Sequence, residues 1–90
     1  MQKRCHVFFT GTVQGVGFRY TAHMFARQYN IKGWVANIAD GRVELEAEGS
    51  DYALNQFLAS LQNEFRQGIT KMQTEEYPSI AGYNDFRIKR

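Results

Sequence analysis

The chain has 90 residues, 43% hydrophobic and 14% aromatic, which is enough for one folded domain, residues 1–90, with a single core. The 11 Lys and Arg residues against 9 Asp and Glu leave a net charge of +2, too even to indicate a nucleic-acid or membrane surface. One cysteine excludes an intrachain disulfide and a multi-cysteine metal site. No apolar run has the length of a membrane span and no signal-peptide pattern is present, so we expect a cytoplasmic protein.

Residues 3–10 alternate in a way that predicts a strand. One face would carry Cys5, Val7 and Phe9, and the other His6, Phe8 and Thr10. Nothing near Cys5 in the sequence indicates a lowered thiol pKa. We therefore interpret Cys5 as a small buried hydrophobic residue.

A glycine-rich stretch, Gly-Thr-Val-Gln-Gly-Val-Gly-Phe-Arg at residues 11–19, follows this strand and leads into a predicted helix over residues 18–29. Three glycines in seven residues let the backbone bend and approach a ligand closely. No Gly-Lys-Ser/Thr is present, which excludes a Walker loop, and Tyr20 replaces the third glycine of a dinucleotide fingerprint. Free backbone N–H groups, the helix dipole and Arg19 favour an anion site, most often for phosphate, over an ordinary flexible turn.

The predicted helix over residues 18–29 has one apolar stripe. The stripe consists of Phe18, Ala22, Phe25, Ala26 and Tyr29. Asn30 fits the left-handed position that often ends a helix. His23 lies one turn after Arg19, and we interpret it as a solvated surface histidine rather than a second anion contact or an acid–base group.

Residues 31–38 and 42–48 predict two strands joined by a tight turn at residues 39–41, because Asp-Gly favours hairpin turns. The second of these strands alternates without a slip. Its core face would carry Val43, Leu45 and Ala47, and its other face Arg42, Glu44, Glu46 and Glu48.

Ser50 is a good N-cap for a second helix that would end near residues 67–68. Its apolar face would carry Leu54, Phe57, Leu58 and Leu61. A fourth strand is predicted over residues 69–75, a loop over residues 77–84 and a short last strand at residues 86–88.

This order of elements predicts an α+β, ferredoxin-like split β-α-β sandwich: an antiparallel sheet of four to five strands with two helices on one face. The first two strands would run parallel, so the glycine loop and Asn37 would lie at the same edge of the sheet. One intervening strand would separate them by roughly 10 Å. Loop amides, Arg19 and Asn37 could then share a small ligand, although Asn37 could equally do no more than begin the hairpin turn.

Four segments together make the sequence similar to the acylphosphatase family. They are residues 11–19, Gly-Trp-Val-Ala-Asn at 33–37, Asp-Gly-Arg-Val-Glu at 40–44 and Phe-Arg-Ile at 86–88. The similarity spans essentially the whole chain. It implies the ferredoxin-like fold and hydrolysis of acyl phosphates to a carboxylate and inorganic phosphate, with no metal and no cofactor.

The resemblance also implies which residues form the site. The family's phosphate-binding arginine falls on Arg19 and its water-positioning asparagine on Asn37. Its cradle of loop amides falls on Gly15, Val16, Gly17, Phe18 and Arg19. We expect a monomer that binds a small-molecule acyl phosphate, or inorganic phosphate or sulfate, and neither nucleic acid nor membrane. Thr12 departs from the family, which usually has an arginine there.

Other functions are known on the same order of elements. An RNA-binding module would need aromatic and basic residues on the open sheet face, where this chain would instead place Glu44, Glu46 and Glu48. A metal chaperone would need a Cys-x-x-Cys, which is absent. A regulatory domain would bind its ligand without turnover. An acylphosphatase-like part of a larger maturation enzyme would come with a further domain, which these 90 residues do not contain.

Overall fold

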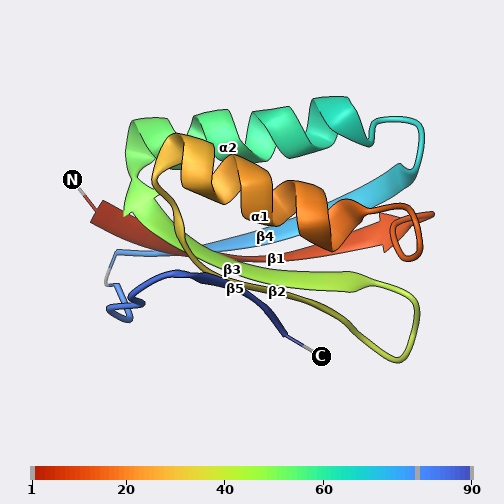
Figure 1. Ribbon diagram of the computed structural model, residues 1–90, viewed down its shortest axis with the longest axis horizontal. Coiled ribbons are helices and arrows are strands. Elements are labelled where there is room, and N and C mark those ends of the chain that lie inside the picture. Colours follow the sequence, from red (N-terminus) through yellow and green to blue (C-terminus); the bar gives the residue numbers. More distant parts are fainter. Residues whose placement is uncertain (1, 79, 90) are drawn as a thin grey trace.

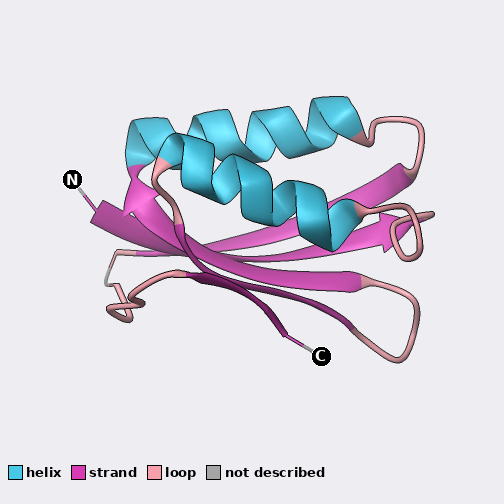
Figure 2. Ribbon diagram, viewed as in Figure 1, coloured by secondary structure: helices cyan, strands magenta, loops and turns pink. Residues whose placement is uncertain are grey.

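A computed structural model describes residues 2–78 and 80–89 of the chain. Two helices lie side by side on one face of a five-stranded sheet (Figure 1, Figure 2). The elements in chain order are β1 (Gln2–Gly11), α1 (Phe18–Tyr29), β2 (Lys32–Asn37), β3 (Val43–Ser50), α2 (Asp51–Glu64), β4 (Ile69–Tyr77) and β5 (Phe86–Lys89). This arrangement confirms the predicted α+β ferredoxin-like fold.

The strands lie in the order β4-β1-β3-β2-β5, so β3 separates the two strands that flank α1. β3 pairs antiparallel with β1 and β2, and β4 pairs antiparallel with β1. The prediction of a wholly antiparallel sheet is wrong for β5, which runs parallel to β2. The pairing directions explain this difference. Because β4 runs antiparallel to β2, the last residue of β4 lies at the same end of the sheet as the first residue of β2. The connection therefore leads straight into a strand that runs in the same direction as β2.

The core lies between the sheet and the helices. Its largest fully buried side chains are Phe9, Phe18, Phe57, Leu45, Leu54 and Leu61. Each such side chain contributes about 1.5–3 kcal/mol when it is removed from water. Cys5 is part of this core, and burial raises the pKa of its thiol to about 11. The interpretation of Cys5 as a buried hydrophobic residue is thereby confirmed.

Local signals set the bounds of the helices. α1 spans Phe18–Tyr29 as predicted, and Asn30 follows it in the left-handed conformation, with φ 57° and its N–H donating to carbonyls of the last turn. The Oγ of Ser50 accepts a hydrogen bond from the N–H of Ala53 at 3.1 Å, which confirms the predicted N-cap. α2 ends at Glu64, earlier than predicted, because the carbonyl of Phe65 closes a tight turn by accepting the N–H groups of Gly68 and Ile69.

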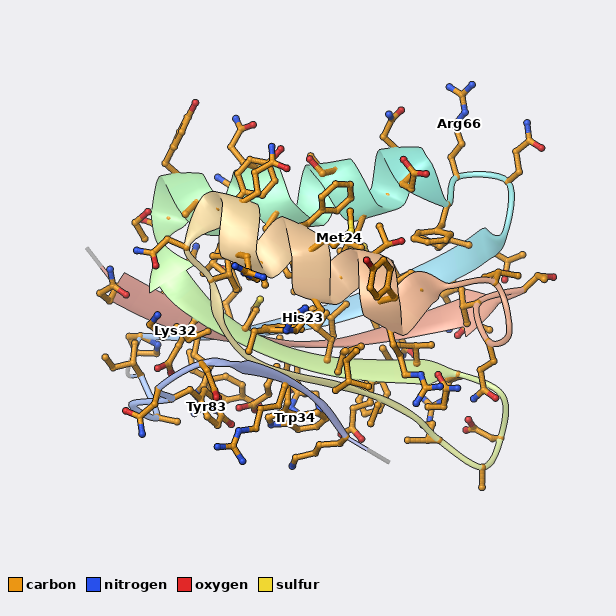
Figure 3. The ribbon with its side chains drawn as sticks, in the orientation of Figure 1. His23, Met24, Lys32, Trp34, Arg66 and Tyr83 are labelled. Atoms are coloured by element: carbon orange, nitrogen blue, oxygen red, sulfur yellow. The ribbon has the colours of Figure 1, made fainter. Side chains whose placement is uncertain are left out.

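The outer face of the sheet, away from the helices, is less open than predicted. Glu46 and Glu48 point to this face as expected, but both are buried. The carboxylate of Glu48 accepts the backbone N–H groups of Ala81, Gly82 and Tyr83 at 2.7, 3.0 and 2.8 Å. The loop before β5 therefore folds over this face, and Tyr83 lies beside Trp34 there, at 3.2 Å between the phenol oxygen and the indole nitrogen (Figure 3).

Glu46 is the centre of a polar network on this face. Its carboxylate accepts hydrogen bonds from Arg4 at 2.9 Å and from the hydroxyl of Tyr83, and it lies 2.8 Å from Nδ1 of His6. The Nε2 of His6 lies 2.7 Å from the carboxylate of Glu44. Burial alone would raise the pKa of Glu46, but the hydrogen bonds from Tyr83 and His6 and the charge of Arg4 outweigh it and hold this pKa below its ordinary value.

The lowered pKa of Glu46 predicts acid sensitivity of the fold. A depressed carboxyl pKa stabilises the folded state fully above the unfolded-state pKa, and this stabilisation is lost as pH falls through the folded-state pKa. We expect the free energy of unfolding to decrease below about pH 5 and the Glu46→Gln variant to lose less stability over that range. Urea unfolding of both proteins between about pH 3 and 7 measures the difference. Glu64→Gln is the control, since Glu64 is exposed, and an equal pH slope for the wild type and Glu46→Gln would contradict the assignment.

Candidate active site

The connection between β1 and α1 leaves the amino end of α1 open to a ligand. Gly15 and Gly17 adopt positive φ angles of 75° and 83°, and a Cβ added at either would meet nothing within 4 Å. Gly17 caps α1 without a side-chain hydrogen bond, and the first turn contains no acidic residue. The N–H groups of a helix's first turn have no partner within the helix, and together with the positive end of the helix dipole they form the kind of arrangement that binds oxyanions.

Arg19, in the first turn of α1, adds a full positive charge beside these amides. It is half-buried and lines the same cavity as Gly15 and Gly17. Among residues 2–78 and 80–89, no carboxylate oxygen lies within 4.0 Å of its guanidinium. Its donors are therefore not engaged in an ion pair of the described chain and can serve a ligand.

Asn37 enters this cavity from the last position of β2. Its side-chain Oδ1 is buried and has no hydrogen-bond partner among the described residues. A buried polar atom without a partner is rare in proteins and marks a place where a water or ligand belongs. Asn37 thus ends β2 and lines the same cavity as Gly15 and Gly17.

The cavity has a volume of about 230 Å³. Its lining residues are Val13, Gly15, Gly17, Phe18, Arg19, Tyr20, Asn37 and Ile88. Figure 1 shows the β1–α1 connection and the β2–β3 hairpin at the same end of the molecule, as the topology predicted. The fold thus brings together most of the predicted site residues. Val16 is not among the lining residues, and its side chain is 45% exposed.

Sequence reasoning missed three of the lining residues, Val13, Tyr20 and Ile88. Ile88 comes from β5, which lies beside β2, and Tyr20 lies next to Arg19 on α1. Both side chains are exposed, at 39% and 65%. The alternation at residues 86–88 indicated a strand, but its parallel pairing with β2 carries no local signal.

Two further residues lie away from the cavity. His23 is partly exposed, and its ring centroid lies 6.5 Å from that of Phe86, outside the lining of the candidate site. Thr12, the departure from the family pattern, is exposed, and its backbone N–H donates to the carbonyl of Gly68 at 2.9 Å. Neither side chain contributes to the lining.

The described residues contain no group of three or more His, Cys, Asp and Glu side chains able to hold a metal ion. None of the described helices is long and apolar enough to cross a membrane. On the outer face of the sheet, Arg4 and His6 are paired with Glu44 and Glu46.

Fold and site together define an α+β ferredoxin-like domain with a cavity lined by a helix amino terminus, an arginine and an asparagine. The sequence model of the acylphosphatase family matches residues 5–88. The chain therefore belongs to the acylphosphatase family, whose enzymes hydrolyse acyl phosphates.

Individual relatives agree with this assignment. The acylphosphatase of Bacillus pumilus is 44% identical over 89 residues, an alignment that covers 93% of this chain and 94% of that protein. The crystal structure of an acylphosphatase from Bacillus subtilis superposes with a TM-score of 0.90 at 36% identity, covering 98% of this chain and 99% of the other. Full-length HypF, in its phosphate- and nucleotide-bound form, matches the whole chain with a TM-score of 0.85 at 28% identity over 12% of its own length.

Proposed function

We propose that this chain, acting as a single-domain monomer, hydrolyses a small acyl phosphate without a metal ion, using Arg19, Asn37 and the loop amides. The observation that carries the proposal is that one cavity joins a helix amino terminus, an arginine and a buried amide oxygen. Among the described residues, the arginine has no ion-pair partner and the amide oxygen has no hydrogen-bond partner. All of these groups come from one chain, which is why a monomer suffices.

The amide groups of Gly15, Val16, Gly17, Phe18 and Arg19 form the proposed cradle for the phosphoryl group. Their N–H groups and the guanidinium of Arg19 together can bind three phosphoryl oxygens. A guanidinium donates to two oxygens at once, which suits the charge that spreads over the equatorial oxygens as phosphorus flattens. Because these donors are fixed before the substrate arrives, little reorganisation is needed in the transition state.

Asn37 is the proposed guide for the attacking water. Its neutral amide accepts a hydrogen bond through Oδ1 and donates through Nδ2, so it can hold water in line with the leaving group. The water oxygen forms a bond to phosphorus while the bond between phosphorus and the acyl oxygen breaks. The carboxylate departs with that electron pair, and the proton of the water passes to a phosphoryl oxygen. An acyl phosphate is already activated, so positioning and charge stabilisation provide the catalysis.

The test of this mechanism is the variant Asn37→Ala, assayed with benzoyl phosphate in a chelating buffer. We expect its kcat to fall about 100-fold, or roughly 3 kcal/mol, as when one positioned donor is removed from an active site. Product inhibition by inorganic phosphate should change little, because Arg19 and the loop amides hold that group. The wild type should keep its rate in the chelator.

Asn55→Ala is the matched control, because Asn55 is exposed on α2. It should hydrolyse benzoyl phosphate at the wild-type rate. A large loss of phosphate affinity in Asn37→Ala would make Asn37 a phosphate ligand rather than a guide for water. Loss of wild-type activity in the chelator would show that the reaction needs a metal.

A further inference from the structure

A single side chain connects the glycine loop to the β2–β3 hairpin, the two segments that flank the cavity. Gln14 lies directly before the loop amides, and its Nε2 donates to the carbonyl oxygens of Ile38 and Arg42 at 2.8 and 2.9 Å. Ile38 directly follows Asn37, and Arg42 lies on the opposite side of the β2–β3 hairpin. Both N–H groups of one amide therefore link the loop to the base of the hairpin that carries Asn37.

The two acceptor carbonyls already close the hairpin. The N–H of Ile38 donates to the carbonyl of Arg42 at 3.0 Å, and the N–H of Gly41 donates to the carbonyl of Ile38 at 3.1 Å. Each oxygen has a second lone pair, which the amide of Gln14 takes. The amide thus joins both sides of the turn at once and limits sliding as well as separation of the hairpin and the loop.

The sheet itself does not provide this connection. β1 and β2 are not neighbours, because β3 lies between them. Gly15 and Gly17, both with positive φ angles, have no side chains that could make this connection. Within residues 2–78 and 80–89, no other side-chain hydrogen bond joins residues 12–19 to the hairpin at residues 38–42.

We propose that Gln14 is a positioning residue that sets the distance between the phosphoryl cradle and the water held by Asn37. This role rests on the proposed function of Asn37. Gln14 is not among the residues that line the cavity, so its effect passes through the hairpin. In-line attack depends steeply on the approach of the two reacting atoms, and a displacement of about 1 Å can cost about 100-fold in rate.

The variant Gln14→Met keeps the length of the side chain and removes both donors. We expect its kcat for benzoyl phosphate to fall about 10- to 100-fold, in the range set by such misplacement. Inhibition by inorganic phosphate should stay within about threefold of the wild type, because the cradle itself is unchanged. A general loosening of the fold would instead weaken phosphate binding and kcat together.

A double-mutant cycle with Asn37→Ala separates the proposed role from a purely structural one. If Gln14 acts through Asn37, the change Gln14→Met should alter kcat by less than about threefold once Asn37 is already alanine. An equal loss of kcat in both backgrounds, or wild-type kcat in Gln14→Met, would overturn the proposal. Wild-type kcat in Asn37→Ala alone would overturn the proposed function itself and the role of Gln14 with it.

Asp40→Ala is the matched control for the hairpin. Asp40 accepts hydrogen bonds from the N–H and Nε of Arg42 at 3.1 and 2.8 Å, so it stabilises the same turn without touching the loop. Its kcat should stay near that of the wild type, and an equal loss there would assign the effect to the hairpin alone. If Gln14→Met does not fold by circular dichroism, Gln14→Asn keeps a polar amide that is too short to reach, and the same cycle applies.

Discussion

The variant Arg19→Lys is expected to lose most of its acyl phosphate hydrolysis while its fold remains intact. A lysine keeps the charge but cannot donate to two phosphoryl oxygens in the plane of a guanidinium. Loss of one transition-state donor typically costs about 100- to 1,000-fold in kcat. The fold should survive, because no described carboxylate pairs with Arg19 and the substitution breaks no ion pair of the described chain.

Steady-state hydrolysis of benzoyl phosphate and far-ultraviolet circular dichroism together test this expectation. Arg27→Lys is the matched control, since Arg27 is exposed in the last turn of the same helix. It should match the wild type in both measurements. Near-normal hydrolysis by a folded Arg19→Lys would remove Arg19 from the mechanism and leave the loop amides as the only proposed phosphoryl ligands.

The variant Gly33→Ala is expected to fold poorly or not at all. Gly33 has φ 143°, and a Cβ added there would lie 1.9 Å from the carbonyl oxygen of Glu46. That oxygen belongs to the backbone of β3, which is paired on both sides and cannot withdraw cheaply. Overpacking and backbone strain together should cost at least about 3 kcal/mol, a large part of the 5–15 kcal/mol that stabilises a typical domain.

Urea unfolding followed by circular dichroism measures this cost. Gly41→Ala separates the two causes, because Gly41 also has a positive φ, 94°, but an added Cβ meets nothing within 4 Å. It should lose only about 1–2 kcal/mol from the backbone conformation. Equal losses in the two variants would show that the contact with β3 is relieved by a shift of the strands.

Part of the site can be predicted from the sequence because it is built from neighbouring residues. The glycine loop, the start of α1 and Arg19 are contiguous, so chain direction alone places the amides and the guanidinium together. Asn37 could be assigned to the same edge by topology, but not to the cavity. Its place in the cavity lining depends on the length and register of β2 and is seen only in the structure.

On the outer face of the sheet, too, the sequence predicted the direction of side chains but not their surroundings. Alternation in β3 correctly predicted that Glu46 and Glu48 point away from the helices. It could not predict their burial, because the groups that cover them, around residues 81–83, come from another part of the chain. The lowered pKa of Glu46 likewise depends on contacts with Arg4, His6 and Tyr83, each more than 35 residues away in sequence.

The sequence by itself determined the order and type of the elements, the bounds of α1 and membership of the acylphosphatase family, since helix caps, alternation and motifs are local properties. Only the tertiary structure decided the parallel placement of β5, the position of Ile88 in the cavity lining and the hydrogen bonds of Gln14 to the hairpin. It also showed that Oδ1 of Asn37 has no hydrogen-bond partner among the described residues. The physical reason is that hydrogen-bond partners and burial are set by segments that meet only after the chain has folded. A short-range sequence pattern therefore does not predict these partners or this burial.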